Sequence, residues 1–123
     1  MHASGAVSAC CEVIDFNGSL ALIRHIVFWK LRPEYKQGLE VPDAARMELS
    51  LGAMRTGIAG LRHIELRRNA LESAEGADLV LYSEFDSWEA LDAYQTHPLH
   101  EDFKRLIGPL RTERRVADFE ATA

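Results

Sequence analysis

The sequence predicts one α+β domain, in which a four-stranded antiparallel sheet carries helices on one face only. Its length of 123 residues suits a single domain. Four segments have the β-branched and aromatic composition of strands, and two long segments carry apolar residues at helical spacing. The order of these segments along the chain predicts how the strands and helices are arranged.

Residues 1–19 are predicted to be an extension, partly disordered, that precedes a domain spanning residues 20–123. The two cysteines, Cys10 and Cys11, lie next to each other in this extension. A disulfide needs Cα atoms at least ~4.4 Å apart, whereas a trans peptide holds neighbours at about 3.8 Å. We therefore expect both thiols to be reduced and the protein to be cytoplasmic.

The first predicted strand is residues 20–31, LALIRHIVFWKL, and Pro33 ends it. Alternation places His25, Val27 and Trp29 on one face, and Ile26 and Phe28 on the other. Since both faces are apolar, both must be covered. Helices cover one face of such a sheet, and a second copy of the sheet is the economical cover for the other. The sequence therefore predicts a homodimer.

Residues 34–42 are expected to form a short helix or loop. Asp43 can cap a helix that begins at Ala44. Its apolar face is formed by Met47, Leu51, Met54 and Ile58, and Gly57 and Gly60 end it. A second strand is predicted at 61–69 and a third at 78–85, with a loop at 72–77 between them.

A helix at 87–96 begins with a capping-box-like pair, Asp86 and Glu89. His97-Pro98 interrupts it, because proline disfavours the helical conformation in the residue before it. Pro98 suits the first turn of a new helix that extends to Leu110, and residues 112–120 are predicted to be the last strand. The resulting βαββαβ order is the ferredoxin-like arrangement.

Composition excludes several classes of partner. The 14 basic and 19 acidic residues give a net charge of −5, which argues against binding to a nucleic-acid backbone. No apolar run approaches the roughly 18 residues of a membrane span. The chain has no glycine-rich phosphate loop and no nucleophile motif. His25, His97 and His100 with Glu101 or Asp102 lack the spacing of a specific metal site, so no metal or cofactor is expected.

Three candidate site residues surround the helix break: Tyr94, His97 and His100. His100 falls in the first turn of the new helix, where the positive helix end favours neutral imidazole and attracts anions. Neutral imidazole can act as a general base, and Tyr94, one turn earlier, can donate a hydrogen bond to an oxyanion. In the structural alternative, His97 caps the helix and the Tyr94 ring packs in the core.

Two further features leave alternatives open. His25 needs a polar partner in its apolar strand, so it is either a satisfied core histidine or a second polar group in a pocket with His100. The basic residues Arg111, Arg114 and Arg115 are either a solvated strand edge or an anion contact.

Three segments resemble the stress-responsive dimeric α/β-barrel (Dabb) family over about residues 22–120: IRHIVFWKLRPE, DLVLYSEFDSWEALDAYQTHPLHEDF and RRVADFE. The most specific parts are the H-[IV]-V-x-[FW]-K strand and the Y-x-x-H-P-x-H segment. The resemblance implies a ferredoxin-like protomer and a dimer in which two sheets join into a barrel. Most members of the family have no established reaction, and some plant members are induced by stress.

One plant branch, resembling olivetolic acid cyclase, catalyses an intramolecular aldol condensation of a polyketide. By motif, the resemblance makes Tyr94 and His100 its catalytic pair and His25 its pocket histidine. It implies a pocket between sheet and helices lined by Val27, Trp29, Met47, Leu51, Leu81, Phe103 and Val116, with His97 nearby. Arg111 and Arg114 stand where the cyclase is apolar, which favours a smaller or anionic ligand.

Three functions remain open at this point. The first is a stress-responsive dimer with a small-molecule pocket and no established reaction. The second is a cofactor-independent enzyme, in which His100 is the general base, Tyr94 stabilises the enolate and His25 is a second polar anchor. The third is a monooxygenase-like or haem-binding dimeric barrel, a class that shares the architecture with different motifs.

Overall fold

The computed structural model describes residues 13–14, 20–36, 44–71 and 75–122. The strands are β1 Val13–Ile14, β2 Leu20–Leu31, β3 Leu61–Arg68, β4 Leu79–Phe85 and β5 Arg111–Thr122. The helices are α1 Pro33–Lys36, α2 Ala44–Gly57, α3 Trp88–Gln95 and α4 Pro98–Ile107, followed by the 3-10 turn η1 Gly108–Leu110. The predicted α+β class and element order are confirmed.

The differences from the predicted elements are local. The chain contains the two-residue strand β1, which the sequence did not predict and which pairs with the start of β2. The last helix ends at Ile107 and gives way to η1, because Pro109 has no amide hydrogen to continue the helix. The predictions for Asp43, Cys10 and Cys11 lie outside the described residues. Within the described ranges, no helix is long and apolar enough to cross a membrane.

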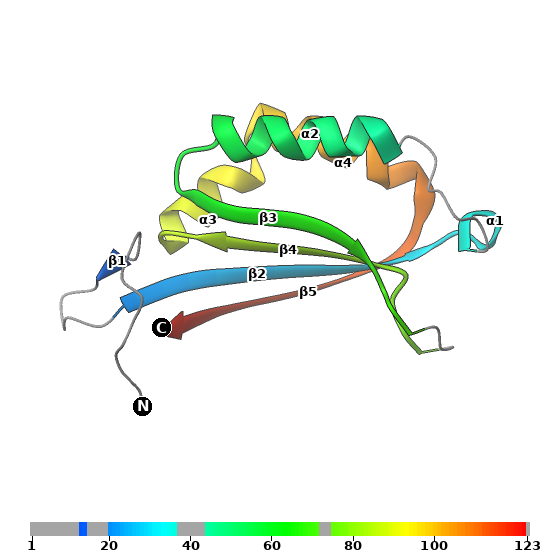
Figure 1. Ribbon diagram of the computed structural model, residues 1–123, viewed down its shortest axis with the longest axis horizontal. Helices are drawn as coiled ribbons and strands as arrows, with labels where there is room; N and C mark the ends of the chain where they lie inside the picture. The colour runs from blue at the N-terminus through cyan, green and yellow to red at the C-terminus, as the bar shows by residue number, and fades with distance from the viewer. Residues whose placement is uncertain (1–12, 15–19, 37–43, 72–74, 123) are drawn as a thin grey trace.

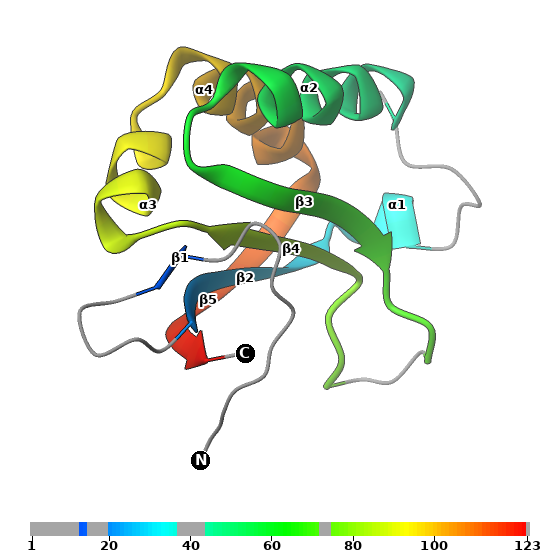
Figure 2. The same ribbon diagram turned by 60° about the vertical axis from the view of Figure 1, so that its left-hand side comes forward.

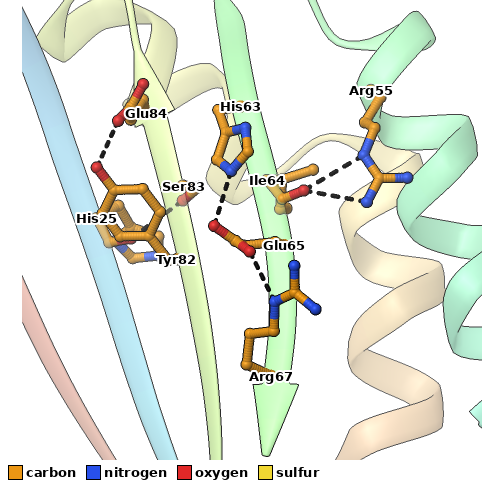
Figure 3. Close-up of polar contacts among 9 residues, drawn as sticks. All are labelled: His25, Arg55, His63, Ile64, Glu65, Arg67, Tyr82, Ser83 and Glu84. Atoms are coloured by element: carbon orange, nitrogen blue, oxygen red, sulfur yellow. Dashed lines mark hydrogen bonds and ion pairs between the residues drawn. The ribbon is translucent and has the colours of Figure 1, made fainter.

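The four long strands form an antiparallel sheet in the order β5-β2-β4-β3. Figures 1 and 2 show α2, α3 and α4 together over one face of this sheet. The core lies between the two layers, and its members from strands and helices include Val27, Leu81, Met47, Leu51 and Phe103. The guanidinium of Arg55 in α2 also donates to the Ile64 carbonyl of β3 at 3.1 and 3.3 Å (Figure 3), which ties the helix to the sheet.

The opposite face of the sheet has no helix over it in the described chain (Figures 1 and 2). Phe28 of β2 and Phe119 of β5 belong to this face and are 37% and 43% exposed. The predicted alternation in β2 is confirmed, since His25, Val27 and Trp29 are buried under the helices. An apolar surface of this kind on one side of a sheet needs a cover.

The turn from α2 into β3 requires a glycine. Gly60 has φ +83°, which side chains other than glycine rarely adopt. A Cβ added there would lie 2.5 Å from the Cβ of Ala90 in α3. The close approach of this turn to α3 helps to place the helix whose last turn carries Tyr94.

Candidate functional site

The break between α3 and α4 positions the central pair of the site. Ser87 caps α3 by accepting a hydrogen bond from the Ala90 amide at 3.1 Å. The predicted capping pair of Asp86 and Glu89 is therefore wrong, because Asp86 precedes the cap and pairs with Arg62 at 2.7 Å. His97 is extended, as expected before proline, and its Nδ1 accepts a hydrogen bond from the Leu99 amide at 3.1 Å. Tyr94 therefore lies in the last turn of α3, and His100 in the first turn of α4.

The rings of Tyr94 and His100 stack on each other, with centroids 4.0 Å apart and an interplanar angle of 24°. Tyr94 is fully buried, and among the described residues its hydroxyl has no hydrogen-bond partner. His100 is 6% exposed, and its Nδ1 lies 3.4 Å from the Gln95 carbonyl oxygen. A carbonyl accepts, so Nδ1 carries the hydrogen in this contact and Nε2 of the neutral ring keeps its lone pair.

Burial sets the protonation states of this pair. Loss of solvent lowers the pKa of His100 to about 4, because the charged imidazolium is disfavoured. Burial raises the pKa of Tyr94 above its ordinary range, and the Arg114 guanidinium opposes that shift. At neutral pH, His100 is an uncharged proton acceptor and Tyr94 a hydrogen-bond donor.

The third histidine has a carboxylate partner. The pairing of β2 with β5 places Asp118 opposite His25, and Asp118 Oδ1 contacts His25 Nδ1. On the other side of β2, Ser83 Oγ donates to the His25 carbonyl at 3.1 Å (Figure 3). The carboxylate holds the His25 hydrogen on Nδ1 and orients the ring. The edge of that ring meets Tyr94, with centroids 5.8 Å apart.

A cavity of about 70 Å³ opens beside His100, between the sheet and α4. Its lining residues are Val27, Trp29, Leu81, His100, Phe103, Lys104, Ile107, Gly108, Arg111 and Arg114. Seven of these residues were singled out from the sequence. The sequence analysis did not assign Lys104, Ile107 and Gly108 to the site. Ile107 could have been predicted, because its helical spacing from Phe103 places both residues on the same face of α4.

The other residues that the sequence suggested for the site do not line this cavity. Met47 and Leu51 are buried core residues of α2, which the cavity does not reach. His97 caps α4. Tyr94 stacks on His100, and His25 packs against Tyr94, but neither of them lines the cavity. Val116 is 41% exposed on the edge strand β5, opposite Val27. Asp118 was not singled out, because only the long-range strand register brings it to His25.

No group of three or more histidine, cysteine or acidic side chains in the described ranges is placed to hold a metal ion. Glu101, one of the acidic residues considered for such a group, forms an ion pair with Lys104 at 3.4 Å. Asp102, the other, pairs with Arg105 at 2.6 Å. The site therefore consists of ring nitrogens, a phenol, one carboxylate and three cationic side chains.

Comparisons with known proteins agree with the architecture. The family described as the stress responsive A/B barrel domain (Dabb) matches residues 23–121. A dimeric protein of unknown function with a ferredoxin-like fold from Bacteroides fragilis is 28% identical, with a TM-score of 0.62, over 81% of this chain and 96% of that one. No curated protein matches the chain.

Two further solved structures share the fold. A dimeric ferredoxin-like protein of unknown function from Thermobifida fusca is 22% identical, with a TM-score of 0.67, and covers 89% of this chain and 98% of its own. A Dabb family protein from Mesorhizobium loti is 23% identical, with a TM-score of 0.61, over 80% and 95% of the two chains. None of these descriptions names a reaction.

Proposed function

Since this chain belongs to the stress-responsive A/B barrel domain family, we propose that it is a cytoplasmic homodimer that binds a small molecule beside His100. We further propose that it moves a proton to and from that molecule without a cofactor. The observation that carries the proposal is the neutral, buried His100 at the wall of a cavity, stacked on the unpartnered Tyr94. A neutral imidazole at the wall of a cavity is suited to acid–base chemistry.

The dimer is supported by the uncovered face of the sheet. Phe28 and Phe119 expose aromatic surface there, and half-buried Ile26 lies between them on the same face. Solved structures of similar proteins from Bacteroides fragilis and Thermobifida fusca are described as dimeric. Two copies of this face, packed against each other, would remove the aromatic surface from water in both.

In the proposed reaction, a C–H bond next to a carbonyl or nitro group of the ligand breaks. Its proton goes to Nε2 of His100, and its electron pair moves onto the ligand oxygen. Lys104, Arg111 and Arg114, which line the cavity, stabilise the negative charge on that oxygen. Tyr94 stacks on the His100 ring from outside the cavity, and the His25–Asp118 pair packs against Tyr94. Return of the proton from His100 regenerates the base.

The burial of His100 restricts the substrate. A base whose pKa is about 4 is weak, so it removes protons efficiently only from an activated carbon. Carbon between two electron-withdrawing groups, or next to a nitro group, meets this requirement. Nitroethane is a suitable test compound because it has few heavy atoms and exchanges its acidic hydrogens slowly.

The experiment is deuterium exchange into nitroethane, followed by NMR with the purified protein in heavy water. We expect exchange at least about tenfold faster than in buffer, and we expect this acceleration to be lost in His100→Gln. The matched control is His63→Gln, which removes an exposed histidine of β3 that pairs with Glu65 (Figure 3). Equal rates for the wild type and His100→Gln, with both proteins folded, would contradict the proposal.

A further inference from the structure

The geometry points to a small carboxylate as the ligand class of this cavity, recognised by Arg111 and Arg114 with Lys104. The inference deepens the proposed function, because it concerns the same cavity, but binding can be measured without any reaction. Four features of the cavity support it: its charge, the strand register beside it, its unpartnered donors and its size.

The cavity collects positive charge in a chain whose net charge is −5. Lys104, Arg111 and Arg114 all line it, and none of the described acidic residues does. In the part of the chain that the structure describes, neither arginine side chain forms an ion pair or a side-chain hydrogen bond. Within the described ranges, Lys104 forms its ion pair with Glu101 at the protein surface, at 3.4 Å. Two guanidinium groups without a carboxylate partner at one cavity are suited to binding an anion.

A strand irregularity brings the two arginines to the same face. Residues three positions apart in a regular strand point to opposite faces. Here the register between β2 and β5 shifts between Lys30 and Leu31, so that Trp29 is opposite Arg114 and Leu31 is opposite Arg111. Since Trp29 and Leu31 are both buried under the helices, the shift directs both arginines to that side. Bulges of this kind often redirect a side chain toward a site.

The surrounding groups favour a carboxylate with a short apolar part. The Trp29 side chain lines the cavity, and its buried Nε1 donor has no partner among the described residues. A carboxylate oxygen would supply the missing acceptor. The remaining walls are apolar side chains: Val27, Leu81, Phe103 and Ile107. They would cover a short carbon chain, but they would leave oxygens of a phosphate unsatisfied.

The size of the cavity sets the length of this ligand. A cavity of about 70 Å³ holds roughly five water-sized groups. Propionate has about that many heavy atoms, and its carboxylate at the arginines would leave its carbon chain against the apolar walls. His100 forms part of the same wall. The arginines would then position the ligand, and His100 would face its carbon atoms.

Binding is measured with propionate, using tryptophan fluorescence. The chain has two tryptophans, and Trp88→Phe, at a 47% exposed position of α3, leaves Trp29 as the only reporter. In that background we expect propionate to bind at least about tenfold tighter than neutral propionamide. Arg114→Gln and Arg111→Gln should each weaken propionate binding by roughly tenfold to a hundredfold. Arg105→Gln is the matched control, since it removes the same charge from the exposed side of α4, and we expect a change within about twofold.

Each outcome has a defined meaning. Equal binding of propionate and propionamide, or no effect of either arginine substitution in folded protein, overturns the inference. Tighter binding of inorganic phosphate than of propionate also overturns it, in favour of an inorganic anion site. If propionate binds through Arg114 but nitroethane exchange is absent, the proposed reaction fails and this inference stands. If exchange occurs and Arg114→Gln binds propionate normally, only this inference fails.

Discussion

The burial of His100 has a measurable cost at acidic pH. The folded-state pKa of His100 is about 4, below the ordinary value of about 6.5 for an unfolded chain. Between these values, the unfolded state binds a proton that the native state does not. The free energy of unfolding therefore falls as the pH falls from about 6.5 toward 4.

The size of this effect follows from the shift. A difference of about 2.5 pKa units corresponds to about 3 kcal/mol when the pH lies below both values. Between about pH 7.5 and about pH 4.5, most of this amount, roughly 2.5 kcal/mol, should be lost through His100 alone. A substitution that removes the imidazole but keeps a polar side chain, His100→Gln, should abolish this component.

The assay is urea unfolding of the wild type and His100→Gln, at one protomer concentration and several pH values. Fixed concentration matters because unfolding of a dimer depends on it. All other titrating groups act in both proteins, so the difference between their pH profiles isolates His100. Relative to the wild type, the free energy of unfolding of His100→Gln should rise by about 2.5 kcal/mol between about pH 7.5 and about pH 4.5. If the free energies of unfolding of the two proteins change with pH in the same way, burial does not keep His100 neutral.

Four further substitutions test other parts of the structure. Gly60→Ala should destabilise the fold by about 1–3 kcal/mol in urea unfolding, because both the φ of +83° and the close contact with Ala90 disfavour a side chain at this position. An unchanged urea midpoint would show that this turn does not require glycine. Asp118→Asn removes the carboxylate partner of His25 and should lower the free energy of unfolding by about 1–2 kcal/mol in the same assay. A decrease of only a few tenths of a kcal/mol would show that this pair does not stabilise the fold. Phe28→Asp should shift sedimentation from about twice the 13.8 kDa chain mass toward the monomer, and an intact dimer would place the interface elsewhere. Ser87→Ala removes the α3 cap and should lower the thermal midpoint by an amount equivalent to about 1 kcal/mol, and no shift would contradict that role.

Much of the site's local framework could be predicted from the sequence, because it depends on neighbouring residues. Proline at position 98 excludes a helical His97, which separates α3 from α4 and leaves Tyr94 and His100 on either side of the break. The alternation in β2 likewise places His25, Val27 and Trp29 on one face. The ferredoxin-like class followed from the succession of elements along the chain.

The tertiary structure alone decided which side chains meet. Asp118 reaches His25 across 93 positions of sequence through the register of β2 with β5. Edge-strand position leaves Val116 exposed despite its apolar side chain.

The sequence by itself determined the long elements, their order, the helix break and the two apolar faces of the first long strand, because periodicity and proline geometry act within a few residues. Only the tertiary structure decided the shape and charge of the cavity. A register shift of one residue redirects Arg111 to the side of Arg114, and the packing of α2 keeps Met47 and Leu51 away from the cavity they were expected to line. Strand register and helix packing depend on contacts between distant segments, which no local pattern encodes.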